Sequence, residues 1–299
     1  MKTVYYELTT YCPARCPHCH IPAGLRHDFP RQRDFCDFAI DMMILRDKLG
    51  VENVVLSGGE PTFHPDFLSM VKFASKLFKT AVISNGFNPK LLKEASAQAR
   101  IWVSLDYYGE KQDRWRKTRG LWRKYEAVAD IANIRSTLLS DNLPDIEKLV
   151  EEAVKRGREI TIVPYKGKNQ NLAPSPEQMQ ELLIFIFEKG YADKAVIDCP
   201  SVNFYIKLKT AQNPTETSLC MAAQQIIRID PEGNIHPCPF LDRKICNMID
   251  GDLPQKIAQE RARITDTYTG KCIFCTYQTL CGGCKASQNT ECFSYKPKP

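Results

Sequence analysis

Short apolar runs alternate along the chain with longer stretches in which apolar residues recur at helical spacing. The apolar runs predict strands near residues 3–8, 51–56, 80–84, 100–105, 132–138 and 159–164. The stretches between them predict helices, most clearly over residues 35–49, 65–78 and 145–156. Regular alternation of strands and helices predicts an α/β fold with a parallel sheet and right-handed crossovers. Six strand–helix units are fewer than the eight of a closed (β/α)8 barrel, so a partial (β/α)6 barrel is expected.

Local signals mark the ends of several predicted helices. Gly50 and Gly157 follow two of them, and glycine commonly ends a helix because it adopts a left-handed backbone conformation without strain. Ser175 and Gln178 stand at the spacing of a capping box, with Pro176 in the first turn. These signals predict a helix that begins near residue 176.

The pattern changes after about residue 195, where cysteines become dense and predicted helices become short. Two segments, 226–229 and 234–238, flank a turn-forming segment and predict a β-hairpin. We therefore expect two domains, a barrel over residues 1–195 and a small cysteine-rich domain with short helices over residues 196–299. The second is too small and too polar to rely on a hydrophobic core, so metal sites would stabilise it.

The composition is that of a globular protein, with 299 residues of which 43% are apolar and 25% charged. No apolar run reaches the roughly 18 residues of a membrane span, and the N-terminus lacks a signal-peptide pattern, so a cytoplasmic protein without a membrane partner is expected. Thirteen cysteines in a reducing compartment indicate metal ligation rather than disulfides. The net charge of +6 is too small and too dispersed to indicate nucleic acid binding.

Three cysteines follow the first predicted strand in a Cys-x3-Cys-x2-Cys arrangement: Cys12, Cys16 and Cys19. Iron–sulfur clusters are usually held by four cysteines, so three thiolates from one loop indicate a cluster with one iron open to another ligand. A structural zinc ion with His18 or His20 as the fourth ligand is an alternative interpretation. Inert thiols of a core segment are another.

A glycine-rich segment, Ser57-Gly58-Gly59-Glu60-Pro61, follows the second predicted strand. Its glycines let the backbone approach a ligand closely, and its glutamate can accept hydrogen bonds from an ammonium group. Together with the cysteine loop, this segment resembles the radical SAM superfamily. The resemblance implies that Cys12, Cys16 and Cys19 hold a radical-generating [4Fe–4S] cluster whose open iron binds S-adenosylmethionine. Reductive cleavage of that cofactor would yield a 5′-deoxyadenosyl radical, which abstracts hydrogen from a substrate.

Further positions match the same superfamily in order along the first domain. The resemblance implies that the Gly58-Gly59-Glu60 segment holds the amino group of S-adenosylmethionine. It also assigns cofactor contacts to residues near the ends of later strands and before the third cysteine: His18, Ser84, Asn85, Ser104, Arg116 and Val163. Each match is weak alone, since a segment such as Ser84-Asn85-Gly86 usually forms only a turn. Their order and spacing support the assignment.

The last third of the chain carries seven cysteines in a second pattern: Cys220, Cys238, Cys272, Cys275, Cys281, Cys284 and Cys292. The pattern resembles the SPASM domain, an auxiliary-cluster module of radical SAM enzymes that mostly modify peptides and proteins. The resemblance implies one auxiliary [4Fe–4S] cluster on Cys272, Cys275, Cys281 and Cys292. It implies a second auxiliary cluster, the third in all, on Cys220, Cys238 and Cys284, completed by Cys199, by Cys246 or by an open iron. Zinc ribbons use similar Cys-x2-Cys pairs and are the alternative.

Two departures from the family pattern bear on function. Cys281 and Cys284 are separated by two residues where relatives have three, which leaves the cluster assignment of Cys284 open. Sulfatase-activating relatives place an aspartate, acting as a base, directly after the cysteine that corresponds to Cys238. Here Pro239 stands at that position and Asp242 is the nearest candidate, which argues against that activity.

The densest basic run covers residues 111–124 and is interleaved with Trp115 and Trp122. It predicts a solvated helical face with Arg116 directed to the cofactor. A docking surface for an acidic electron donor, a flavodoxin or ferredoxin, is the second interpretation. Binding of single-stranded nucleic acid is the third.

The sequence thus predicts a radical SAM oxidoreductase whose substrate class follows from family resemblance alone. A peptide or protein is the expected substrate, and crosslinking, epimerisation or oxidation are among the possible products. Because the chain begins with the first predicted strand, no fused leader-binding domain is expected, and a separate peptide-recognition protein would be a partner. The alternatives are the same chemistry on a small molecule or cofactor precursor, and a zinc-stabilised binding module.

Overall fold

The structure is a computed structural model of the chain, and it describes all residues except 210–219, 269, 282, 288–291, 293–295 and 299. The chain divides into two compact units. The first contains Met1–Ser104, Gly109–Asn133 and Met221–Ala262. The second contains Leu105–Tyr108, Ile134–Cys220 and Arg263–Pro299.

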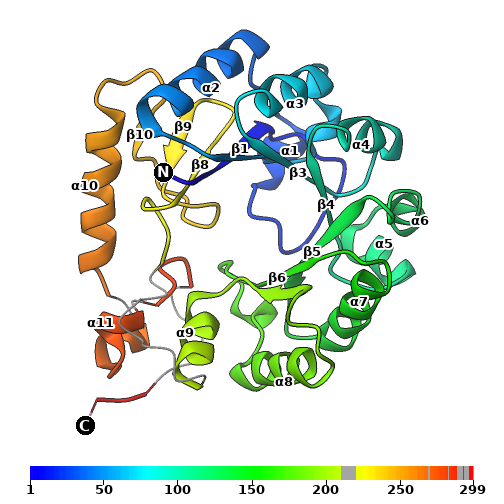
Figure 1. The fold of residues 1–299 in the computed structure, drawn as a ribbon, viewed down its shortest axis with the longest axis vertical. Coiled ribbons are helices and arrows are strands. Elements are labelled where there is room, and N and C mark those ends of the chain that lie inside the picture. The colour runs from blue at the N-terminus through cyan, green and yellow to red at the C-terminus, as the bar shows by residue number, and fades with distance from the viewer. Residues whose placement is uncertain (210–219, 269, 282, 288–291, 293–295, 299) are drawn as a thin grey trace. The chain divides into compact units, whose positions relative to one another are not determined.

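The described strands of the first unit form a sheet in the order β10-β9-β8-β1-β2-β3-β4 (Figure 1). β8, β1, β2, β3 and β4 are parallel, whereas β9 and β10 are antiparallel to their neighbours. Their bounds are β1 (Thr3–Thr9), β2 (Asn53–Gly58), β3 (Lys79–Ser84), β4 (Arg100–Ser104), β8 (Ile226–Ile229), β9 (Asn234–His236) and β10 (Cys246–Asn247). The parallel arrangement brings the C-terminal ends of β1 to β4 to one edge of the sheet.

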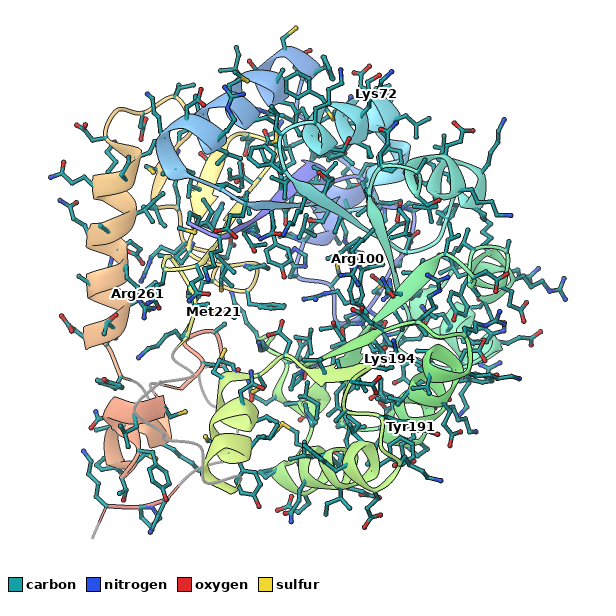
Figure 2. The ribbon with its side chains drawn as sticks, in the orientation of Figure 1. Lys72, Arg100, Tyr191, Lys194, Met221 and Arg261 are labelled. Atoms are coloured by element: carbon teal, nitrogen blue, oxygen red, sulfur yellow. The ribbon has the colours of Figure 1, made fainter. Side chains whose placement is uncertain are left out.

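Helices α2 and α3 lie side by side on the outer side of these strands (Figure 1). The Asp34 side chain caps α2, and Gly50 ends it with a φ of 56°. The helices of this unit are α1 (Ala23–His27), α2 (Phe35–Leu49), the 3-10 helix η1 (Pro61–Phe63), α3 (Phe67–Ser75), α4 (Pro89–Ala95), α5 (Glu110–Arg116), α6 (Leu121–Glu126) and most of α10 (Leu253–Asp266). Arg261 of α10 donates from Nη1 to the carbonyl of Ala222 at 3.2 Å, beside Met221 (Figure 2).

Successive side chains of β1 point to opposite faces of the sheet, and those of Tyr6 and Leu8 belong to the hydrophobic core. Tyr6 and Leu8 are fully buried, and the Tyr6 ring meets Phe38 of α2 edge-on at a centroid distance of 5.2 Å. The Tyr6 hydroxyl donates to Asp41 of α2 at 2.5 Å. Because successive side chains of a strand point to opposite faces, Glu7 lies on the face away from α2.

The second unit contains most of β5 (Ala132–Leu138) together with β6 (Ile160–Pro164) and β7 (Ala195–Ile197). These three strands pair in parallel in that order. Its helices are α7 (Leu143–Lys155), η2 (Gln170–Leu172), α8 (Pro176–Glu188), α9 (Pro200–Lys209), η3 (Gly270–Phe274) and α11 (Gln278–Cys281). The Ser175–Gln178 capping box begins α8, as the sequence predicts.

The structure confirms the predicted α/β fold and its parallel sheet. The six predicted strands correspond to β1–β6, and the predicted 35–49 helix coincides with α2. The 226–238 hairpin also forms, as β8 and β9. Two features were not predicted: the short strand β7, and the parallel pairing of β8 with β1. The domain boundary near residue 195 stays a prediction. Among the described residues, no helix is both long enough and apolar enough to cross a membrane.

Candidate functional site

Cys12, Cys16 and Cys19 pack together around Ala14 just beyond the C-terminal end of β1. Cys12 and Cys16 are 7% and 9% exposed, and Cys19 packs against them. The Arg15 amide donates to the Arg116 carbonyl at 3.0 Å, so the loop is held to the end of α5. The three thiols therefore form a compact and largely buried group.

The electrostatic surroundings differ among the three thiols. Burial raises the pKa of Cys12 to about 12, and the nearby charges of Glu60, Cys16 and Cys19 raise it further. Burial also raises the pKa of Cys19, while Arg26 and Arg116 lower it. Without a metal the Cys12 thiol therefore keeps its proton at neutral pH, and metal binding would displace that proton.

The residues around the loop fit an anionic iron–sulfur cluster. The guanidinium groups of Arg26 and Arg116 act on Cys19 and would offset the negative charge of thiolates. Arg26 donates from Nη1 to the Ala14 carbonyl at 3.0 Å, but its buried Nε has no hydrogen-bond partner among the residues that the structure describes. An unpaired buried donor beside the thiols matches a site built to receive a negatively charged group.

The zinc interpretation fits this geometry less well. Within the part of the chain that the structure describes, no three His, Cys, Asp or Glu side chains are grouped closely enough to hold one metal ion. A cubane binds each cysteine through a different iron, so its thiols stand farther apart than the ligands of one zinc ion. The two histidines are also engaged, since His18 Nδ1 accepts from Trp115 at 2.8 Å and His20 Nε2 lies 3.1 Å from Glu7 Oε1.

Gly58 and Gly59 let the end of β2 approach the backbone that leads into the cysteine loop. A Cβ on Gly58 would lie 2.3 Å from the Thr9 carbonyl oxygen, and one on Gly59 would lie 2.3 Å from those of Thr10 and Tyr11. The Gly59 amide donates to the Thr9 carbonyl at 2.7 Å. The close approach that the sequence assigns to a ligand is thus occupied by the protein's own backbone, and these glycines fix the start of the cysteine loop.

Glu60 is fully buried and gathers hydrogen bonds from two other segments. Its Oε1 accepts from the Thr62 hydroxyl at 2.6 Å, the Thr62 amide at 3.1 Å and the Ser84 hydroxyl at 2.8 Å. Its Oε2 accepts from the Asn85 amide at 2.7 Å. Burial raises the pKa of Glu60, while these hydrogen bonds lower it. Oε2 thus accepts one hydrogen bond where Oε1 accepts three.

Asn85 joins the Glu60 carboxylate to the cysteine loop. Its side-chain Nδ2 lies 3.5 Å from Cys12 Sγ, within hydrogen-bonding distance for sulfur. Asn85 is only 5% exposed, so this contact is buried. The structure therefore brings Glu60, Ser84, Asn85 and Cys12 into one hydrogen-bonded chain.

His18 and Ser104 both contact side chains of α5. The His18 and Trp115 rings lie at an interplanar angle of 6° with centroids 5.7 Å apart. Because the indole N–H can only donate, Nδ1 of His18 must accept, and in the neutral ring the proton is on Nε2. Ser104, the last residue of β4, accepts through its carbonyl from Gln112 Nε2 at 3.0 Å. Arg116 ends the same helix and is 7% exposed.

Val163 and most of the C-terminal cysteines belong to the second unit. Val163 is 4% exposed on β6, opposite Thr137. Burial raises the pKa of Cys281 to about 12, and the charges of Cys292, Cys272 and Cys199 raise it further, so these thiols are neighbours. Burial likewise raises the pKa of Cys272, with added repulsion from Cys275 and Cys284.

Cys284 has a different electrostatic environment from these thiols. Burial raises its pKa, but Lys166 and hydrogen bonds near Ser287 outweigh burial and hold the pKa below its usual value. Gly283 packs directly on Cys272, since a Cβ there would lie 2.6 Å from the Cys272 sulfur. In the first unit, Cys238 is 5% exposed just after β9, and Cys246 is 3% exposed on β10.

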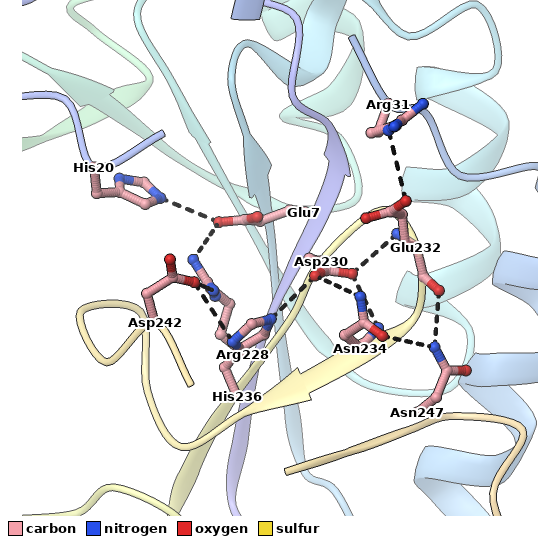
Figure 3. A network of polar contacts seen from close by, with 10 residues as sticks. All are labelled: Glu7, His20, Arg31, Arg228, Asp230, Glu232, Asn234, His236, Asp242 and Asn247. Atoms are coloured by element: carbon pink, nitrogen blue, oxygen red, sulfur yellow. Dashed lines mark hydrogen bonds and ion pairs between the residues drawn. The ribbon is translucent and has the colours of Figure 1, made fainter. Parts of the chain in front are cut away.

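A polar network that the sequence did not reveal includes Glu7 of β1, Arg228 of β8 and His236 of β9 (Figure 3). Glu7 Oε1 contacts His20 Nε2 at 3.1 Å and Arg228 Nη1 at 3.7 Å. Arg228 Nη2 donates to Asp242 at 3.1 Å, and His236 Nε2 lies 3.0 Å from Asp230. Through His20, which directly follows Cys19, the network connects β1, β8 and β9 to the cysteine loop. The Asp242 side chain is 88% exposed.

Sequence reasoning also missed several residues close to the cysteine loop. Thr62 contacts Glu60, and Arg26 contacts the cysteine loop. Neither stands at a characteristic spacing from the motif that it contacts, so only the folded chain shows these contacts. Trp115 was visible within the basic run, but its contact with His18 spans 97 residues and has no local signature.

Together these features define a class of protein. Clustered thiols, a buried glutamate and cationic side chains lie at the carboxyl edge of a parallel sheet, where α/β enzymes place their chemistry. The protein is therefore an α/β enzyme with a metal-cluster site.

A sequence profile of the Radical SAM superfamily matches residues 6–171, which is more than half of the chain. The chain belongs to this superfamily. It is accordingly an enzyme that uses a [4Fe–4S] cluster and S-adenosylmethionine.

Three similar proteins extend the comparison beyond the profile. The chain is 22% identical to the AdoMet-dependent heme synthase of Oleidesulfovibrio alaskensis, covering 95% of this chain and 82% of that protein. It is 24% identical to the mycofactocin maturase MftC of Mycobacterium ulcerans, again covering 95% and 82%. Streptococcus suis SuiB bound to its precursor peptide SuiA shares the fold, with a TM-score of 0.71 at 16% identity over 95% of this chain and 72% of SuiB.

Proposed function

We propose that Cys12, Cys16 and Cys19 hold the radical-generating [4Fe–4S] cluster and that S-adenosylmethionine binds beside it. The observation that supports this proposal is the convergence of the three thiols with the buried Glu60–Asn85 chain at one edge of the sheet. When bound, the cluster and cofactor supply a 5′-deoxyadenosyl radical. The chain's own residues exclude water, orient the thiols and offer cationic and acceptor groups to the cofactor.

The remaining predicted cofactor residues take positions that suit this role. Glu60 Oε2 offers an acceptor for the amino group, and Arg116 offers a guanidinium near Cys19 for the carboxylate. His18 and Ser104 border α5, which also carries Arg116. Gly58 and Gly59 act indirectly by fixing the cysteine loop, while Ser84 supports Glu60. Val163 is proposed as an adenine contact on the basis of family resemblance alone.

Metal analysis tests the ligand assignment. Anaerobically purified wild type should contain near twelve irons per chain if three cubanes are present, and a Cys12/Cys16/Cys19→Ala variant should lose about four. The variant should also fail to cleave S-adenosylmethionine. Zinc with little iron after anaerobic reconstitution would overturn the assignment in favour of a zinc-stabilised module.

We further propose a peptide or protein as the substrate. The support is the similarity to the maturase MftC over 95% of the chain and the shared fold with SuiB, whose structure contains a precursor peptide. Short peptides encoded beside this protein should bind to it. In the presence of reductant and S-adenosylmethionine their masses should change, by two units for an oxidative crosslink. A separate peptide-recognition protein would then increase peptide affinity.

A second candidate is the same radical chemistry on a small molecule or cofactor precursor. The observation that favours it is the similarity to an AdoMet-dependent heme synthase over 95% of the chain. Binding of tetrapyrrole but of no encoded peptide would establish this candidate and exclude the first. Both substrates should be assayed against the Cys12/Cys16/Cys19→Ala variant, which distinguishes radical chemistry from simple binding.

We propose that the C-terminal third is a SPASM-like module with two auxiliary clusters. Cys272, Cys275, Cys281 and Cys292 would hold one, and Cys220, Cys238 and Cys284 most of the other. The charges of Cys292 and Cys272 both act on the pKa of Cys281, which supports the first set. The second set would be completed by Cys199, by Cys246 or by an open iron. Loss of iron in Cys199→Ser or in Cys246→Ser would identify the additional ligand, and loss in neither variant would indicate the open iron.

The proposed electron donor is a flavodoxin or ferredoxin in the cytoplasm. The basic residues of α5 and α6 support its docking there, because Trp115 and Arg116 connect α5 directly to the cysteine loop. Charge reversal of Lys117, Arg119 and Arg123 should slow reduction by flavodoxin at low salt and have less effect at high salt. Unchanged reduction at both salt concentrations would exclude this surface.

A further inference from the structure

Asn85 donates a buried hydrogen bond to one of the proposed cluster ligands. The distance from Asn85 Nδ2 to Cys12 Sγ is 3.5 Å, and the two residues are 73 positions apart in the chain. Both are less than a tenth exposed. Water therefore does not compete for the sulfur as it would at the surface, so the amide has a stronger effect on it.

The direction of the Asn85 amide is fixed by its surroundings. The backbone N–H of Phe87 donates to Asn85 Oδ1 at 3.0 Å, which identifies that atom as oxygen and leaves the NH2 group facing the sulfur. The Asn85 backbone is itself held by its amide bond to Glu60 Oε2 at 2.7 Å. The donor is thus preorganised by two independent hydrogen bonds and does not depend on a favourable rotamer.

We propose that Asn85 is a positioning residue that raises the reduction potential of the radical-generating cluster through its hydrogen bond to Cys12 Sγ. Reduction adds one electron, and part of its charge falls on the cysteine sulfurs, so an N–H donor stabilises the reduced form more than the oxidised form. This role differs from the direct cofactor contact that family resemblance assigns to Asn85. The inference rests on the proposed ligand assignment of Cys12 and is independent of the substrate class.

Potentiometric titration of the full-length reconstituted protein, followed by electron paramagnetic resonance without S-adenosylmethionine, tests this proposal. The signal of the Cys12/Cys16/Cys19→Ala variant is subtracted to remove the auxiliary clusters. Asn85→Leu removes the donor at similar size, and Asn85→Asp keeps the acceptor for Phe87 but replaces the donor with a charge. Asn88→Ala is the matched control, since the Asn88 side chain donates to Thr62, beside the same carboxylate.

The expected order of midpoint potentials is wild type and Asn88→Ala highest, then Asn85→Leu, then Asn85→Asp. At fixed potential the ratio of reduced to oxidised cluster should fall about tenfold in Asn85→Leu, which corresponds to about 59 mV for one electron. Equal potentials in wild type and both Asn85 variants would overturn the proposal. Loss of the cluster's four irons from both variants would also overturn it, because Asn85 would then be needed for assembly rather than for tuning. If the triple cysteine variant loses no iron, the ligand assignment itself fails, which is a distinguishable result.

Discussion

Replacing Gly59 with alanine tests whether the glycine-rich segment positions the cysteine loop. The added Cβ would lie 2.3 Å from the carbonyl oxygens of Thr10 and Tyr11 and 2.6 Å from the Tyr11 carbonyl carbon. Ordinary contact requires a separation near 3.5 Å, so β2 and the loop must separate by about 1 Å. Both sides of the contact are backbone joined by short hydrogen bonds, including Glu60 N to Tyr11 O at 2.7 Å, and neither can rotate away.

The expected cost of Gly59→Ala is about 3 kcal/mol, the upper end of the range for overpacking, because no flexible side chain absorbs the clash. For a chain of this size each kcal/mol lowers the unfolding temperature by roughly 2 °C, which gives a decrease of about 6 °C. Gly50→Ala is the control. Gly50 has a φ of 56° and no atom within 4 Å of an added Cβ, so only conformational strain of about 1 kcal/mol is expected.

The assays are thermal unfolding followed by circular dichroism under anaerobic conditions, and cleavage of S-adenosylmethionine by the reconstituted enzyme. Gly59→Ala should unfold at the lower temperature and lose at least nine-tenths of its cleavage rate. Gly50→Ala should keep its rate, because Gly50 ends α2 far along the chain from the cysteine loop. If Gly59→Ala is as stable as Gly50→Ala and fully active, the proposed role of this glycine is wrong.

Three further predictions concern polar contacts of the first unit. Trp115→Phe removes the hydrogen-bond donor to His18 and should weaken S-adenosylmethionine binding about fivefold in a calorimetric titration, equivalent to about 1 kcal/mol. Unchanged affinity would mean that His18 does not contribute to cofactor binding. Arg228→Met removes the cationic partner of the buried Glu7 carboxylate and should lower the free energy of unfolding by about 3 kcal/mol. Adding Glu7→Gln to that variant should restore part of the lost stability, because the unpaired charge is then removed. Burial raises the pKa of Asp230, but hydrogen bonds from a histidine and an asparagine outweigh burial and hold the pKa below its usual value. Asp230→Asn should therefore cost about 1–2 kcal/mol at pH 7, and the difference from wild type should shrink as the pH falls below about 4, measured by urea unfolding.

The sequence alone determined the elements of this protein and the chemistry that it carries. Helical and strand periodicities are local, so β1–β6 and α2 follow from them without knowledge of the fold. The Cys12-Cys16-Cys19 loop and the Gly58-Gly59-Glu60 segment could be recognised because their residues are neighbours in the chain. Parallel alternation then placed both at the same edge of the sheet.

Only the tertiary structure decided which groups meet at that edge. Glu60 reaches Ser84 and Asn85 across 24 and 25 residues, and Asn85 reaches Cys12 across 73. The parallel pairing of β8 with β1, and the polar network built on it, joins segments more than 200 residues apart. Such contacts depend on strand order, register and backbone spacing, none of which leaves a periodic trace in the sequence. For the same reason the glycines were recognised as sites of close approach, but only the folded chain showed that they approach its own backbone.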